Sequence, residues 1–116
     1  MLFFEEGVTL ASCTLEFNGN NSLITLGKSR HAYRMSVSVF NNCVFSVGRD
    51  NYFNGPLKTI VSEERTVFIG DDCLFSFGVW IRTADPHLVY DAHTKKRMNP
   101  SKDVFIGDHV GLGRMP

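Results

Sequence analysis

The chain has 116 residues, of which 43% are hydrophobic and 21% are charged, a balance typical of one globular domain rather than a disordered segment. Twelve basic residues balance twelve acidic ones, so no net field attracts nucleic acid or an anionic membrane surface. No apolar run approaches the roughly 20 residues needed to cross a bilayer, and we expect no membrane insertion.

The N-terminus and the cysteines both indicate a cytoplasmic protein. The opening "MLFFEEG" turns acidic at Glu5, so it lacks the basic and cleavable regions of a secretory signal. Cys13, Cys43 and Cys73 are odd in number and form no CxxC pair, which favours reduced thiols in the core. We therefore expect residues 1–116 to form a single cytoplasmic domain.

A short apolar segment followed by a turn recurs along the chain, and no window carries the periodicity of an amphipathic helix. The aliphatic-Gly pair in these segments repeats at successive spacings of 21, 22 and 37 residues. Such a repeat indicates a solenoid. The four segments are "LITLGK" (Leu23–Lys28), "VFSVGRDN" (Val44–Asn51), "VFIGDD" (Val67–Asp72) and "VFIGDH" (Val104–His109).

A finer period of six residues links Ile69, Phe75 and Ile81, and it predicts three short strands in each coil of about 18 residues. Spacings of 21 and 22 residues then correspond to one coil plus a few turn residues. The spacing of 37 residues corresponds to one coil plus a loop insertion at about residues 82–103. An antiparallel sandwich with hairpins at "FNGNNS" and "NYFNGP" is the alternative, but it does not explain the six-residue period.

The stretch "IGDDCLFSFGVWI…HLVYD…KRMNPSKDVFIGDHVGLG" resembles the left-handed β-helix (hexapeptide-repeat) acyltransferases, in particular the O-acetyltransferases of sugars and surface polysaccharides. The resemblance implies an all-β, left-handed parallel β-helix of about four to five coils with a long loop insertion. It also implies a homotrimer whose active sites lie in grooves between neighbouring prisms. Acetyl-coenzyme A would be the donor, and a hydroxyl of a sugar or polysaccharide precursor the acceptor.

His87 is the candidate general base, because it lies in the insertion, 19 residues before Ile106, as the catalytic His of the resembled enzymes does. An imidazole titrates near working pH, as removal of a hydroxyl proton requires. Asp85 would orient the ring from its second nitrogen. The alternatives are that His87 is an ordinary exposed loop residue and that Asp85-Pro86 only begins a turn.

Asn54 and Glu63 are the candidate acceptor-binding residues. Asn54 lies in "RDNYFNG", which resembles an R-x-x-Y-x-N segment in which the Asn binds the acceptor sugar; Asn54-Gly55 is equally a turn dipeptide. Glu63, or its neighbour Glu64, would contact sugar hydroxyls.

Arg97 is a third candidate for acceptor binding, within the basic cluster of Lys95, Lys96, Arg97 and Lys102. This cluster would meet coenzyme A phosphates or an anionic glycan, or it is simply a solvated loop. His87, His93 and His109 suggest zinc, but His87 and His93 are six residues apart rather than five as in the zinc enzymes of this fold, so we expect no metal.

Gly111 and Gly113 are the candidate cofactor-binding residues of the last repeat. Gly111 stands where the resembled enzymes nearly always have Trp, and the chain stops at Pro116 where they continue for several coils. A C-terminally short acetyltransferase is the first functional hypothesis. The alternative is a non-catalytic β-helix module for assembly or binding.

Overall fold

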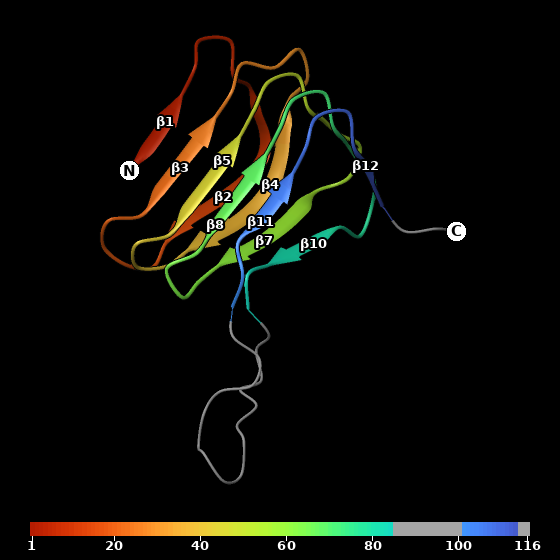
Figure 1. Cartoon of the computed structure of the whole chain (residues 1–116). Helices are drawn as coiled ribbons and strands as arrows, with labels where there is room; N and C mark the ends of the chain where they lie inside the picture. The colour runs from red at the N-terminus through yellow and green to blue at the C-terminus, as the bar shows by residue number, and fades with distance from the viewer. Residues whose placement is uncertain (85–100, 114–116) are drawn as a thin grey trace, which may run out of the picture.

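The computed structural model describes residues 1–84 and 101–113, which form twelve strands and no helix (Figure 1). None of these residues belongs to a helix that could cross a membrane. The strands are β1 (Leu2–Phe4), β2 (Leu10–Phe17), β3 (Leu23–Leu26), β4 (Tyr33–Val39), β5 (Val44–Val47), β6 (Tyr52–Phe53), β7 (Leu57–Val61), β8 (Thr66–Ile69), β9 (Leu74–Phe75), β10 (Trp80–Arg82), β11 (Val104–Ile106) and β12 (Gly111–Leu112).

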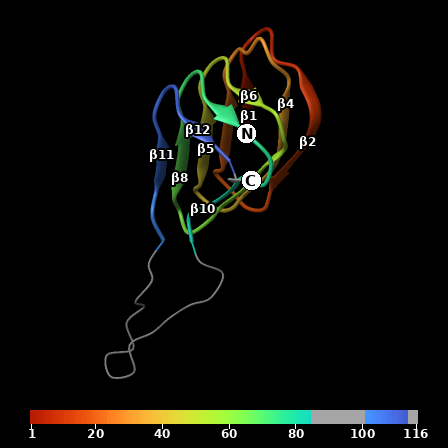
Figure 2. The same ribbon diagram turned by 90° about the vertical axis from the view of Figure 1, so that its right-hand side faces the viewer.

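The strands form three parallel sheets that are the faces of a prism. Sheet A has the order β1-β3-β5-β8-β11, sheet B the order β10-β7-β4-β2, and sheet C the order β12-β9-β6. A full coil passes from sheet A through sheet C and sheet B back to sheet A, and the coils stack in chain order (Figure 2). Every pairing is parallel, so the predicted parallel solenoid is confirmed and the antiparallel sandwich is wrong.

The predicted repeat coincides with the register of sheet A. Leu26 pairs with Val47, Val47 with Ile69, and Ile69 with Ile106, so the unequal spacings each correspond to one coil. The six-residue period is also confirmed. Ile69, Phe75 and Ile81 lie on sheets A, C and B, and all three side chains are buried in the interior.

The register extends to the N-terminus, although the sequence before Val44 shows no clear hexapeptide period. Here β1 pairs with β3 and β2 with β4, but neither of these first two coils has a strand in sheet C. Tyr33 fills the interior instead: its ring packs against Phe53, which stacks on Phe75 with centroids 4.9 Å apart. One buried tyrosine thus extends the interior aromatic stack of Phe53 and Phe75 into a coil that has no strand in sheet C.

Residues in the left-handed backbone region mark two of the prism corners. One column follows sheet B and the other follows sheet A, and each occurs in three successive coils. Asn and Asp tolerate this conformation because their short side chains bond locally. The two columns are Asn21, Asn42 and Glu64 after sheet B, and Asp50, Asp72 and His109 after sheet A.

Glycine follows each of the last strands of sheet A because neighbouring coils approach closely there. A Cβ built on Gly48 would lie 2.7 Å from the carbonyl oxygen of Gly70, closer than real side chains pack. At Gly107, in contrast, a Cβ meets nothing within 4 Å among the described residues. The glycine column is therefore a consequence of coil stacking.

The three cysteines are free thiols, as predicted, and Cys43 and Cys73 are buried whereas Cys13 is half-buried. Burial raises the pKa of the Cys73 thiol, which therefore stays protonated at neutral pH. A protonated, buried thiol is a core residue rather than a nucleophile.

Replacing Phe75 by Ala is expected to lower the free energy of unfolding by about 3–5 kcal/mol, because it opens a cavity in the interior aromatic stack. Phe77→Ala is the matched control: Phe77 is 64% exposed, and its loss is expected to change stability by no more than about 0.5 kcal/mol. Urea unfolding of the two variants measures the difference. Equal stabilities would contradict the assignment of Phe75 to the core.

Candidate active site

The insertion between β10 and β11 is anchored at the corner where sheet B meets sheet A. The Lys102 N–H donates to the Thr83 carbonyl oxygen at 2.8 Å, and this bond joins the two stems of the insertion. The Thr66 N–H donates to the Asp103 carboxylate at 2.9 Å, and Arg65 Nε donates to Ser101 Oγ at 2.9 Å. The turn of the preceding coil thus holds the returning stem.

Thr83 is the buried centre of this anchor. Its hydroxyl accepts from the Ser62 N–H at 2.9 Å and donates to the Ser62 carbonyl oxygen at 3.0 Å. Only 4% of the residue is exposed. Because Ser62 begins the turn that carries Glu63 and Glu64, one hydroxyl fixes both that turn and the outgoing stem.

A second group of candidate residues lies at the opposite end of β7, where sheet C meets sheet B. The Asn54 N–H donates to the Phe75 carbonyl oxygen, and the Ser76 N–H donates to the Leu112 carbonyl oxygen, each at 2.8 Å. Asn54, Ser76 and Gly113 therefore stack in one column on successive coils. A Cβ on Gly113 would lie 2.6 Å from the Ser76 Cβ, so only glycine fits at the top of the column.

Gly111 lies on the outward face of sheet C, in register with Leu74 and, one coil further, Tyr52. Tyr52 and Leu74 are exposed, and a Cβ on Gly111 meets nothing within 4 Å among the described atoms. β12 pairs only with β9, so within residues 1–84 and 101–113 its other edge carries unpaired backbone groups.

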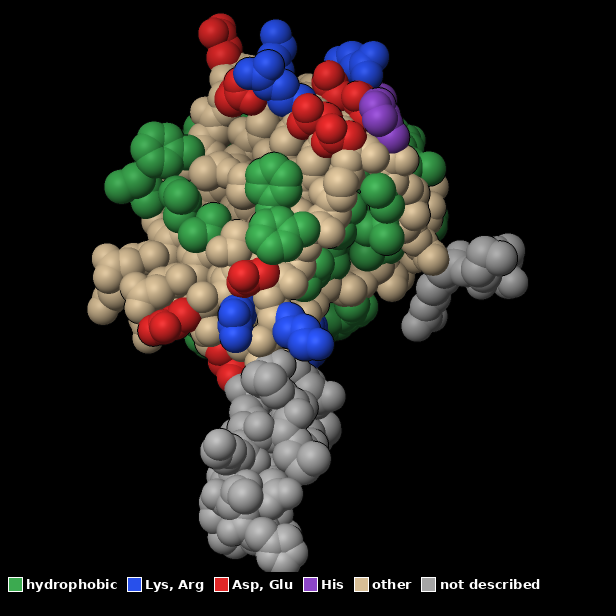
Figure 3. Space-filling view, viewed as in Figure 1, with side chains coloured by type: hydrophobic (Ala, Val, Ile, Leu, Met, Phe, Trp, Pro, Cys, Tyr) green, Lys and Arg blue, Asp and Glu red, His purple; other side chains and the backbone are tan. Residues whose placement is uncertain are grey.

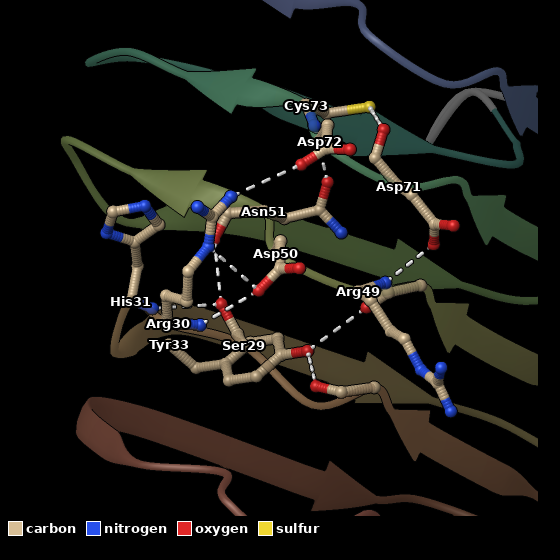
Figure 4. A network of polar contacts seen from close by, with 12 residues as sticks. Ser29, Arg30, His31, Tyr33, Arg49, Asp50, Asn51, Asp71, Asp72 and Cys73 are labelled. Carbon is tan, nitrogen blue, oxygen red and sulfur yellow. Dashed lines mark hydrogen bonds and ion pairs between the residues drawn. The ribbon is translucent and has the colours of Figure 1, made fainter.

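A polar network fills the third corner, where sheet A meets sheet C (Figure 4). Arg30 lies 3.4 Å from Asp50 and 3.7 Å from Asp72, which are carboxylates of the next two coils. The buried Asn51 side chain donates to the Gly70 carbonyl oxygen and accepts from the Cys73 N–H. These contacts run from coil to coil, so the network clamps the stack.

The same corner ties the first coil to the third. Arg49 donates to both oxygens of Glu5, at 3.0 and 2.6 Å. This bond, with a further one from the Lys28 N–H, lowers the pKa of Glu5 to about 2. The carboxylate is therefore ionised across the physiological pH range and acts as a structural acceptor.

The predicted site residues fall into three groups. His87, Asp85 and Arg97, with Lys95, Lys96 and His93, lie outside the described residues. Asn54 and Gly113 share a corner, with Gly111 beside it on sheet C. Glu63 is exposed, has a left-handed backbone, and lies at the other end of β7 beside the stems of the insertion. β7 has five residues, so roughly 16 Å of strand separates Asn54 from Glu63.

Among the described residues no three His, Cys, Asp or Glu side chains form a group that could hold a metal ion. His109 occupies an exposed turn, with its Nδ1 4.0 Å from a carboxylate oxygen of Asp72. It therefore belongs to the clamping network.

The comparisons with known proteins agree with this architecture. No protein-family model matches the chain. A polysialic acid O-acetyltransferase of Neisseria meningitidis is 29% identical over 106 residues, which are 90% of this chain and 48% of that protein. A polysialic acid O-acetyltransferase of Escherichia coli O1:K1 is 40% identical over 55 residues, 47% of this chain and 18% of that protein.

The fold comparison gives the same answer. The crystal structure of the polysialic acid O-acetyltransferase OatWY superposes with a TM-score of 0.73 and 26% identity, covering 88% of this chain and 48% of that one. The homologues of this chain are polysialic acid O-acetyltransferases. The predicted relationship to left-handed β-helix O-acetyltransferases and the predicted fold class are therefore confirmed.

A second structure, that of the polysialic acid-specific acetyltransferase NeuO, shares the fold with a TM-score of 0.64 at 24% identity, covering 97% of this chain and 57% of that one. The chain thus spans about half the length of the meningococcal relative that it matches, 48%.

The sequence interpretation missed Trp80, whose ring lies between Lys58 and Arg82 on the outward face of sheet B. A signal was present, because the only tryptophan of the chain alternates with an arginine along a strand. The partner Lys58 lies one coil earlier and follows only from the register.

The anchor of the insertion can be tested with two buried threonines. Thr83→Val leaves the Ser62 N–H without its partner and leaves the Ser62 carbonyl oxygen with only the Arg65 N–H, at 3.3 Å. We expect this change to cost about 1–3 kcal/mol in the free energy of unfolding. Thr59→Val is the matched control, because the Thr59 hydroxyl is buried with no hydrogen-bond partner among the described residues. We expect that variant to be neutral or stabilised in urea unfolding. The reverse order of stabilities would contradict the anchoring role of Thr83.

Proposed function

We propose that this chain is an acetyl-coenzyme A-dependent O-acetyltransferase that modifies a hydroxyl of an acidic polysaccharide. The observation that carries the proposal is the superposition of nearly the whole coil stack on a polysialic acid O-acetyltransferase. The His-bearing insertion falls between β10 and β11, after the first ten strands of the coil stack.

In the proposed reaction His87 takes the proton of the acceptor hydroxyl as its oxygen attacks the thioester carbonyl carbon. The carbon–sulfur bond then breaks, and the thiolate of coenzyme A receives the proton from the imidazolium. Asp85 holds the imidazole in one tautomer. Backbone N–H groups of a neighbouring coil would donate to the oxyanion that develops, with Gly111 and Gly113 beside the cofactor.

The two groups of site residues support a site shared between copies of the chain. Asn54 and Gly113 lie on one prism edge, and Glu63 lies with the stems of the His87 insertion on another. In a homotrimer the first edge of one copy faces the second edge of its neighbour. Arg97 and the basic residues near it would then meet the acceptor or the coenzyme A phosphates in the groove.

Exposed aromatic residues support association between copies. Phe3, Phe68 and Phe105 are 59%, 43% and 69% exposed and lie in one row across sheet A. Figure 3 shows hydrophobic side chains in separate groups on this face, and Thr25 and Ser46 occupy the row between Phe3 and Phe68. Exposed apolar patches on a sheet face are characteristic of protein interfaces.

The alternative function is a non-catalytic β-helix module for assembly or binding. The open space at Gly111, where the family nearly always has Trp, favours it. Binding of acetyl-coenzyme A separates the two functions, because only the enzyme requires the cofactor. Saturation-transfer NMR with no signal at millimolar acetyl-coenzyme A would favour the non-catalytic module.

The His87→Ala variant is expected to reduce acetyl transfer by about 10²–10⁴-fold, the contribution of a positioned base, with little change in acetyl-coenzyme A affinity. Transfer to a sialic acid oligomer is followed by mass spectrometry. His109→Ala is the control, because His109 lies in the clamping network and should leave the rate unchanged. Equal rates for wild type and His87→Ala would remove His87 from the mechanism.

A further inference from the structure

The outward face of sheet B carries an exposed tryptophan held between two cations. Trp80 on β10 is 52% exposed. The Lys58 ammonium of β7 lies 5.3 Å from the ring centroid, and the Arg82 guanidinium lies 4.8 Å from it. Lys58 is the register partner of Trp80, and Arg82 is two residues further along the same strand. The parallel register therefore creates this group from two coils.

Two side chains with hydroxyl groups lie on the same outward face of sheet B in the earlier coils. The row through Trp80 and Lys58 continues to Ser36 on β4 and Thr14 on β2, at a spacing of about 4.8 Å per strand. An open hollow of ≈ 540 Å³ adjoins this row, and Thr14, Ser36 and Lys58 line it together with apolar residues that include Leu10, Met35 and Pro56. The hollow thus leads away from the tryptophan across the sheet.

The cations of this face have no carboxylate partner among the described residues. The ion pairs within residues 1–84 and 101–113 involve Arg30, Arg49 and His109 at another corner, and none involves Lys58, Arg82 or the exposed Arg34 of β4. The acidic residue on this face of sheet B is Glu16. It lies on β2, at the edge of the sheet opposite β10, and its carboxylate accepts hydrogen bonds from Ser38 and Asn18. Positive charge therefore collects toward β10 in a chain of zero net charge.

We propose that this face is a binding site for an acidic polysaccharide. Lys58 and Arg82 pair with a sugar carboxylate, the Trp80 ring packs against the sugar next to it, and Ser36 and Thr14 bond hydroxyls of the following sugars along the hollow. A neutral glycan lacks the charge that these two cations, which have no carboxylate partner within residues 1–84 and 101–113, would meet. A nucleic acid is a weaker match, because the face has one aromatic ring rather than a row of them for stacking bases.

The site deepens the proposed function, on which it rests for the identity of its occupant as the acceptor polymer. Arg82 precedes His87 by only five residues in the sequence. A polymer held on sheet B is therefore bound beside the strand from which the insertion leaves. Such a site acts on the affinity for a long acceptor and makes no contact with the reacting thioester.

Trp80 is the only tryptophan of the chain, so its fluorescence reports on this site directly. Titration of the full chain with a sialic acid oligomer, without any cofactor, is expected to change the emission in a saturable manner. Added salt should weaken binding, because the pairing groups are exposed. A dextran oligomer of equal length should give no change. Equal responses to dextran or to single-stranded RNA would overturn the proposal.

The double variant Lys58→Gln/Arg82→Gln should weaken oligomer binding by at least about tenfold, through loss of two charge-assisted contacts. The control Lys28→Gln/Arg30→Gln removes the same charge at another corner and should bind as the wild type does. Equal weakening in both variants would show a general charge effect and overturn the site. Because this titration needs no acetyl-coenzyme A, a failure of the proposed chemistry leaves its result unaffected.

Discussion

Parallel backbone hydrogen bonds between successive coils are the interaction on which the rest of this structure depends. Each coil buries too little apolar surface to be stable alone, so it requires a neighbour in register. The register aligns the side chains of Leu26, Val47, Ile69 and Ile106 into one interior column. The register also determines which outward side chains are neighbours, because register partners lie on adjacent coils whatever their separation in sequence.

The sequence predicted those features that recur with the coil. The aliphatic-Gly pairs fixed the register of sheet A, and the six-residue period of Ile69, Phe75 and Ile81 gave the three faces. The six-residue period did not predict the first two coils because they have no strand in sheet C, and in the second coil the bulky Tyr33 is buried against Phe53 instead. Handedness also came from resemblance and not from the period, since both hands share one repeat.

The candidate site was less predictable because its parts lie on different edges of the prism. Motif matching assigned Asn54 and Glu63 to one function, but it contained no information on the five-residue strand between them. Likewise, Trp80 and Lys58 become neighbours only through the stacking of β10 on β7. These sites are formed by side-chain contacts between coils. Motifs of adjacent residues in the sequence do not predict such contacts.

Because the candidate residues lie on two separate edges of the prism, we propose that each active site is shared between two copies of the chain. Co-expression of the His87→Ala and Asn54→Ala chains tests this claim most directly, with acetyl transfer to a sialic acid oligomer as the readout. If each site takes His87 from one copy and Asn54 from its neighbour, random mixing restores about a quarter of the sites although each variant alone is inactive. Mixed assemblies that form but remain as inactive as the separate variants would contradict the shared site.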